Sequence, residues 1–133
     1  MNLYVAPNGN DRWSGCLPNP NAGKTDGPLG TLGGALARLA LLTHGRNYHP
    51  DTFPVNETAP GPITVHLRGG VYALEKPVVF GPEHSWPVMF KAYRNEKPVI
   101  SGARRITNWQ KGSVNGKAAW VADLPEVAEG KWE

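Results

Sequence analysis

The first clear pattern of apolar positions predicts one amphipathic helix. In GTLGGALARLALLTHG (residues 30–45), four apolar side chains recur at i, i+3, i+4 and i+7: Leu32, Ala35, Leu36 and Leu39. This spacing places them on one stripe of a helix of about three turns. Thr31 is suited to the N-cap, and Gly45 to the position just past the C-terminus. Because Gly33 and Gly34 weaken the first turn, we expect the helix to depend on packing.

Beyond residue 62 the period changes to two, which predicts short β-strands. In ITVHLRGG (residues 63–70), the apolar residues point one way, while Thr64, His66 and Arg68 point the other. Further strands are expected in residues 2–6 and within VYALEKPVVFG, PVMFKAY, VISGA, RITNWQ and AAWVADL, the last two separated by a turn at VNGK. The strands at Ile63 and Val88 begin 25 positions apart (88 − 63), a spacing found in repeat proteins. The absence of a second helical crossover disfavours a doubly wound α/β sheet.

Composition agrees with a β-rich globular chain and narrows its partners. The 133 residues include 16 Gly and 13 Pro, yet 40% are hydrophobic, which favours turns and short strands over disorder. The net charge of +3 is spread along the sequence, whereas nucleic-acid binders concentrate basic residues on one face. Cys16 has no second cysteine with which to form an intrachain disulfide. No apolar run reaches the length of a membrane span, so neither nucleic acid nor membrane is an expected partner.

The opening loop offers the residues of a calcium site. Oxygen ligands for Ca²⁺ are available, in a glycine-rich setting, from four side chains: Asn8, Asn10, Asp11 and Asp26. Their spacing does not match an EF-hand, and Asn and Asp in such loops commonly accept hydrogen bonds from nearby backbone. We therefore favour a structural turn, with calcium as the alternative and no other cofactor expected.

The histidines do not form a recognisable metal motif. His44, His49, His66 and His84 lack the i, i+4 spacing of a zinc-binding helix. Only His66, beside Arg68 on an outward strand face, is placed where a surface role is conceivable. We favour a solvated side chain for His66, because exposed strand faces are usually polar.

The carboxylates of the strand region are Glu75, Glu83 and Glu96. A glycosidase needs two carboxyl groups flanking a sugar, one of them kept protonated. Glu83, next to His84, is the best placed acid, and nearby Trp86 offers a ring for sugar stacking. The pattern is too weak to assign catalytic, cofactor-binding or metal-binding residues. The remaining tryptophans of the C-terminal region, Trp109, Trp120 and Trp132, are expected to pack outer surfaces or an interface.

Four blocks in order carry a resemblance to a known family: YVAPNGND, GPLGTLGGALARL, ITVHLRGGVYALEKPVVFGPEHSW and VMFKAYRNEKPVISGARRITNW. Together they resemble the start of right-handed parallel β-helix proteins of the pectate-lyase-like superfamily, above all bacterial members of glycoside-hydrolase type. The segment GPEHSW departs from the DSG-like turn of such proteins. The resemblance implies a mainly β fold, a right-handed parallel β-helix in which the helix caps the first coils of one incomplete domain, residues 1–133.

The resemblance also carries the functional expectations. It implies the N-terminal fragment of a glycoside hydrolase, with the catalytic coils missing, so that the fragment is inactive. The alternatives are a noncatalytic carbohydrate-binding or surface β-helix module, a polysaccharide lyase, or a small basic domain that binds nucleic acid. The expected partners are a polysaccharide or oligosaccharide, bound through the missing coils, and a second copy paired at the open solenoid end. The parent protein is expected to be secreted or periplasmic, although this chain has no signal peptide.

Overall fold

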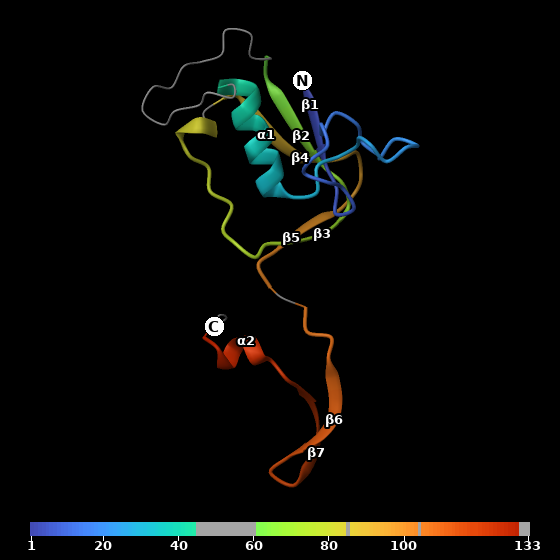
Figure 1. Ribbon diagram of the computed structural model, residues 1–133, viewed down its shortest axis with the longest axis vertical. Helices are drawn as coiled ribbons and strands as arrows, with labels where there is room; N and C mark the ends of the chain where they lie inside the picture. The colour runs from blue at the N-terminus through green and yellow to red at the C-terminus, as the bar shows by residue number, and fades with distance from the viewer. Residues whose placement is uncertain (45–60, 85, 104, 131–133) are drawn as a thin grey trace. The chain divides into compact units, whose positions relative to one another are not determined.

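The computed structural model describes residues 1–44, 61–84, 86–103 and 105–130 and divides the chain into two compact units (Figure 1). The N-terminal unit is Met1–Gly102 and the C-terminal unit is Ala103–Glu133. The features expected at Gly45, His49 and Trp132 lie outside the described residues. Within those residues, no helix is long and apolar enough to cross a membrane.

Two small parallel sheets form the frame of the N-terminal unit. Strands β1 (Asn2–Val5), β2 (Ile63–Leu67) and β4 (Val88–Ala92) make one sheet, in the order β1-β2-β4. Strands β3 (Gly70–Ala73) and β5 (Pro98–Ser101) make the other. A short 3₁₀ helix, η1 (Pro82–His84), lies between β3 and β4 in the chain.

The 25-residue spacing seen in the sequence is the register of two neighbouring parallel strands. Ile63 is paired with Val88, and Val65 with Phe90. Alternation then sends Leu3, Val5 and Val65 inward, where they are 0% exposed, and leaves the intervening residues on the outer face. The outer face of this sheet is where the candidate site lies.

Helix α1 (Leu32–His44) confirms the predicted amphipathic helix. All four residues of the predicted stripe are buried in the core that also contains β1 and β2. The Thr31 hydroxyl accepts a hydrogen bond from the Gly34 N–H at 2.9 Å, as expected of an N-cap residue. In Figure 1, α1 runs beside the sheet, whose inner face it covers.

Tyr72 on β3 joins the two sheets of the N-terminal unit. Its side chain is only 5% exposed, and its hydroxyl lies 2.9 Å from the carbonyl oxygen of Val5 and 2.8 Å from that of Arg68. Burial raises the pKa of Tyr72 to about 12. The corner between β2 and β3 is therefore fixed by a buried, protonated phenol.

The C-terminal unit is built on a hairpin. Strands β6 (Trp109–Val114) and β7 (Lys117–Ala122) are antiparallel and are followed by the short helix α2 (Pro125–Ala128). The two turn residues, Asn115 and Gly116, have φ values of 51° and 79°. Such left-handed pairs are typical of two-residue hairpin turns. None of the described residues of this unit is buried.

The expected right-handed parallel β-helix is wrong. The described residues form separate sheets of three, two and two strands, and none of these is closed or wound into a solenoid. The last two strands pair with each other in antiparallel fashion, because the Asn115-Gly116 turn reverses the chain directly. Two further expectations depended on that fold: that α1 caps a first coil, and that the chain has an open solenoid end. The β-helix was implied by the resemblance of four sequence blocks, and the strand pattern could not test it, because alternating apolar positions specify a strand but not the direction of its partner.

Candidate functional site

The outer face of sheet β1-β2-β4 carries a compact group of aromatic rings. The parallel register aligns Tyr4, His66 and Lys91 in one row across the three strands. The rings of Tyr4 and His66 are stacked, with centroids 5.1 Å apart and planes at 18°. Tyr93, just after β4, stands edge-on to both, at 5.7 Å from Tyr4 and 5.9 Å from His66. We call Tyr4, His66 and Tyr93 the aromatic cluster.

An ion pair borders this cluster and fixes its position. The Nε of Arg68 donates to both carboxylate oxygens of Glu96, at 3.1 and 2.9 Å. The Gly69 N–H donates to the same carboxylate at 2.6 Å. The Arg68 guanidinium also lies over the Tyr93 ring, 4.8 Å from its centroid. The carboxylate of Glu96 thus holds the guanidinium against one wall of the cluster.

Arg68 also ties the opening loop to the sheet. Its Nη1 donates to the carbonyl oxygen of Pro18 and, at 2.7 Å, to Oδ1 of Asn19. The residues around Pro18 are thereby brought to the edge of the outer face. A loop that is distant in sequence becomes part of the border of the candidate site.

The charges of this ion pair are stabilised mutually. The hydrogen bond from Arg68, assisted by the Gly69 N–H, lowers the pKa of Glu96. The same hydrogen bond raises the pKa of Arg68. Glu96 is therefore an ionised hydrogen-bond acceptor, whereas a glycosidase acid requires a raised pKa.

His66 is packed rather than solvated, contrary to the interpretation favoured from the sequence. Its Nε2 lies 3.2 Å from Oδ1 of Asn2, while its Nδ1 is buried and has no hydrogen-bond partner among the described residues. Burial, with a smaller contribution from the charge of Lys91, lowers the pKa of His66. The contacts with Tyr4 and Tyr93 thus favour the neutral form of the imidazole.

The candidate calcium ligands of the opening loop are engaged with the protein itself. Asp11 accepts hydrogen bonds from the N–H groups of Gly30 and Thr31, at 2.8 and 2.9 Å, and from the Thr31 hydroxyl at 2.7 Å. Asn10 accepts one from the Arg12 N–H at 2.9 Å, and Asn8 is exposed nearby. Asp11 therefore joins the loop to the segment that starts α1.

Asp26 plays the same structural role at the other end of the loop. It accepts hydrogen bonds from the backbone N–H and the hydroxyl of Ser14, at 2.7 and 2.8 Å, and from the Gly27 N–H at 2.9 Å. The Ser14 N–H is the main cause that lowers the pKa of Asp26. The described residues contain no group of three or more His, Cys, Asp or Glu side chains placed to hold a metal ion. The loop thus has the bonding expected of a structural turn.

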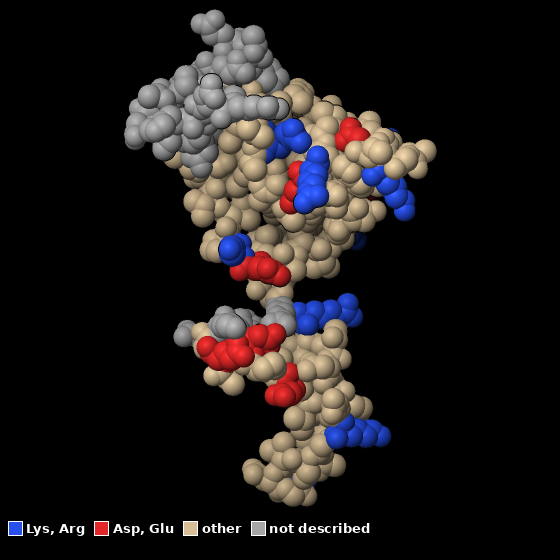
Figure 2. Space-filling view, viewed as in Figure 1, with Lys and Arg blue, Asp and Glu red and all other residues tan. Residues whose placement is uncertain are grey.

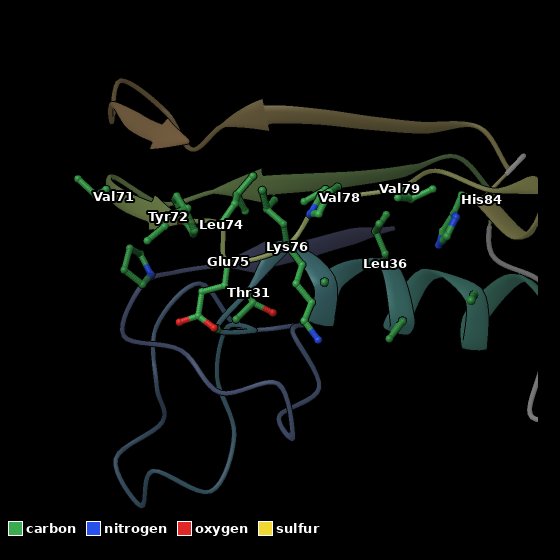
Figure 3. A pocket seen from close by; sticks show the side chains of 18 residues that line it. Thr31, Leu36, Val71, Tyr72, Leu74, Glu75, Lys76, Val78, Val79 and His84 are labelled. Atoms are coloured by element: carbon green, nitrogen blue, oxygen red, sulfur yellow. The ribbon is translucent and has the colours of Figure 1, made fainter. Parts of the chain in front are cut away.

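A groove of the N-terminal unit lies between α1 and residues 71–79 (Figure 3). This groove has a volume of about 870 Å³ and is lined mostly by apolar side chains, among them Leu36, Leu74 and Val78. Glu75 lies beside Thr31 in the view of Figure 3, and His84 lies at the opposite end. Two of the candidate carboxylates thus have different surroundings: Glu75 lines the groove, whereas Glu96 is paired with Arg68.

The candidate acid Glu83 and the candidate stacking residue Trp86 gain no support from the structure. The side chain of Glu83 lies outside the described residues. The ring of Trp86 packs against the hydrophobic core, and its Nε1 donates to the carbonyl oxygen of Gly61 at 3.3 Å. The ring of Trp86 is therefore a core contact rather than an open platform. His84 receives a hydrogen bond from the Gly81 N–H on its Nδ1, at 3.0 Å.

Charge does not form a single large patch on the face of the N-terminal unit drawn in Figure 2. Lysine and arginine side chains lie there among aspartate and glutamate side chains. This mixture agrees with the dispersal seen in the sequence and differs from the basic face of a nucleic-acid binder.

Comparison with known proteins gives one structural relationship. No family model and no curated protein matches the chain. One solved structure aligns with 84% of the chain at 30% sequence identity and a TM-score of 0.64. That structure is described as a glycoside hydrolase. The chain spans only 16% of the length of that protein.

Sequence reasoning missed the aromatic cluster, although a clue was present. The 25-residue register that pairs Ile63 with Val88 also places Lys91 opposite His66 and brings Tyr93 next to Arg68. The 25-residue spacing does not extend to β1, and the sequence pattern does not identify β2 as the strand that pairs with Asn2–Val5. The stacking of Tyr4 on His66 depends on that pairing.

Proposed function

We propose that this chain is a carbohydrate-binding part of a glycoside-hydrolase-like protein and that a sugar ring binds at the aromatic cluster. Two observations support the proposal: the 30% identity to a solved glycoside hydrolase over 84% of the chain, and the ring arrangement on the outer face. The ring arrangement supports the location of the site. The structural relationship supports carbohydrate as the class of ligand.

The chemistry of the cluster suits a sugar. One face of a pyranose ring presents C–H groups that pack on aromatic rings, while the hydroxyl groups at its rim require hydrogen bonds. Tyr4 supplies half-buried aromatic surface, and the exposed Asn2 and Lys91 supply polar groups beside it. Tyr93 is also half-buried, and the guanidinium groups of Arg68 and Arg94 lie 4.8 and 5.0 Å from its ring centroid. The ion pair of Arg68 and Glu96 holds the wall rigid, which lowers the entropic cost of binding.

Binding is proposed for this chain, and hydrolysis for the whole protein. Glu96 and Asp26 have lowered pKa values because each carboxylate accepts several hydrogen bonds. Carboxylates in such surroundings act as fixed acceptors and do not deliver a proton to a leaving group. We therefore expect the 133-residue chain to bind oligosaccharides without cleaving them.

The test is calorimetric titration of the chain with cellohexaose, xylohexaose, mannohexaose and maltohexaose. Tyr4→Leu and Tyr93→Leu keep apolar bulk but remove the ring, so each is expected to weaken binding by about two- to tenfold, from about 0.5–1.5 kcal/mol per aromatic contact. Phe80→Leu is the matched control, because Phe80 is also an exposed ring, 59% accessible, and packs near His84 and Phe90 instead. The proposal would be contradicted if the two tyrosine variants bound as tightly as Phe80→Leu and the parent chain, or if no sugar bound to the parent chain.

A further inference from the structure

The hairpin of the C-terminal unit has two chemically different faces. In the antiparallel register Lys111 is opposite Trp120, and Trp109 is opposite Ala122. Strand alternation then assigns one face to Trp109, Lys111, Ser113, Ala118, Trp120 and Ala122. We call this the tryptophan face. The opposite face contains Gln110, Gly112, Val114, Lys117, Ala119 and Val121.

The tryptophan face presents two open indole rings. Trp109 is 52% exposed and Trp120 is 64% exposed. They are diagonal cross-strand neighbours, since the direct partner of Trp109 lies two residues beyond Trp120. Ala118 and Ala122 are too small to cover either ring. The two rings therefore present their surfaces side by side to the solvent.

Both rings are positioned by contacts within the hairpin unit. The indole N–H of Trp109 donates to the carbonyl oxygen of Ile106 at 3.1 Å, which restricts rotation of that ring. The ammonium of Lys111 lies 5.9 Å from the centroid of the Trp120 ring. The face thus combines fixed aromatic surface with an ammonium and, at Ser113, a hydroxyl.

The opposite face has the composition of a protein contact. Val114 and Val121 are 53% and 40% exposed, and Val121 lies over Gly112, where an added Cβ would be 2.9 Å from its methyl group. A two-stranded hairpin is marginally stable alone, so one of its faces needs cover. The aliphatic valine face meets that need, whereas the tryptophan face carries no Val, Ile, Leu or Met.

We propose that the tryptophan face binds the pyranose rings of a carbohydrate chain, as a second site independent of the aromatic cluster. Diagonal cross-strand residues are about 7–8 Å apart, which allows two indoles to contact successive or next-nearest sugar rings. Lys111 and Ser113 then supply donors for hydroxyl groups at the rim. The choice of carbohydrate as the ligand rests on the proposed function, whereas the choice of Trp109 and Trp120 rests on the geometry of the hairpin.

The test uses the full chain, cellohexaose, xylohexaose and mannohexaose, and tryptophan fluorescence. Saturable quenching on titration is expected, together with an affinity at least threefold weaker in Trp109→Leu and in Trp120→Leu. Val114→Ala, on the opposite face, is the matched control and should bind as the parent does. Amide resonances of Asn115 and Gly116 report whether the hairpin turn is intact in each variant.

A cluster variant separates this inference from the proposed function. In one outcome, the double variant Tyr4→Leu/Tyr93→Leu still binds sugar while the Trp109 and Trp120 variants do not. That result would support the tryptophan face and reject the aromatic cluster as a sugar site. If the tryptophan variants bind as tightly as the parent, the inference is overturned while the proposed function survives. Loss of self-association in Trp120→Leu, with sugar affinity unchanged, would likewise overturn it by assigning the face to a protein partner.

Discussion

Removal of the Tyr72 hydroxyl should lower the stability of the N-terminal unit and change its response to alkali. Tyr72→Phe deletes the donor to the carbonyls of Val5 and Arg68 while keeping the buried ring. The Val5 carbonyl retains the N–H of Arg68 at 2.8 Å, so the main loss is at the Arg68 carbonyl. We expect a cost of about 1 kcal/mol in the free energy of unfolding at neutral pH.

The alkaline effect follows from the raised pKa. A phenol with a pKa of about 12 in the folded state and 10.0 when unfolded stays protonated longer in the fold. Its stabilising contribution is therefore complete below pH 10 and is lost as the pH rises toward 12. The shift of two units (12 − 10) sets an upper limit of about 2.7 kcal/mol.

Urea unfolding, followed by circular dichroism at pH 7 and at steps up to pH 11, measures both effects. The parent chain should lose stability more steeply above pH 10 than Tyr72→Phe does. An equally steep decline in the variant, or an unchanged free energy of unfolding at pH 7, would refute the placement of this hydroxyl between the two sheets.

Three further predictions concern the core, His66 and the sheet edges. Leu39→Ala, at a side chain only 1% exposed, should cost about 2–5 kcal/mol in urea unfolding; a cost below 1 kcal/mol would contradict the packing of α1. Because the pKa of His66 is lowered from 6.5, its contribution to stability is present above pH 6.5 and is lost as the pH falls through its folded-state pKa. His66→Gln should therefore make the free energy of unfolding less dependent on pH in this acid range. An unchanged pH dependence in the variant would count against the burial of His66. Strands β4 and β5 pair on one side only among the described residues, so we propose self-association there; Ile100→Lys should reduce it in sedimentation velocity, and a parent chain monomeric at all concentrations would exclude it.

The elements that the sequence predicts well are those encoded locally. The stripe that includes Leu32 and Leu39 requires only residues within one helix, and Thr31 caps the same segment. The 25-residue spacing also predicts neighbouring strands, because β2 and β4 have the same apolar alternation. Hydrophobic period and capping chemistry thus locate elements without any knowledge of tertiary contacts.

The features that sequence reasoning misses depend on pairing between distant segments. The half-buried ring of His66 packs against Tyr4, which lies 62 positions earlier (66 − 4), and against Tyr93, which lies 27 positions later (93 − 66). The interpretation of His66 as solvated considered only its own strand. The parallel solenoid failed for the same reason at β6 and β7, where the left-handed Asn115-Gly116 turn pairs consecutive strands with each other.

The ion pair of the site shows the same limitation at a finer scale. Glu96 had the residue type of a catalytic acid, and its position in the strand region was known. Only the contact with Arg68 and the Gly69 N–H shows that its pKa is lowered. The role of a carboxylate is decided by the donors around it, and those donors come from another strand end.

The imidazole resonances of His66 report directly on whether a sugar ring binds at the aromatic cluster. Long-range ¹H–¹⁵N spectra of the chain, recorded during titration with the tightest-binding hexasaccharide, report on each histidine ring separately. We expect saturable shifts of the His66 ring signals and no change in those of His84, which lies by the groove beside α1. Saturable binding that leaves His66 unmoved and shifts His84 instead would contradict this expectation.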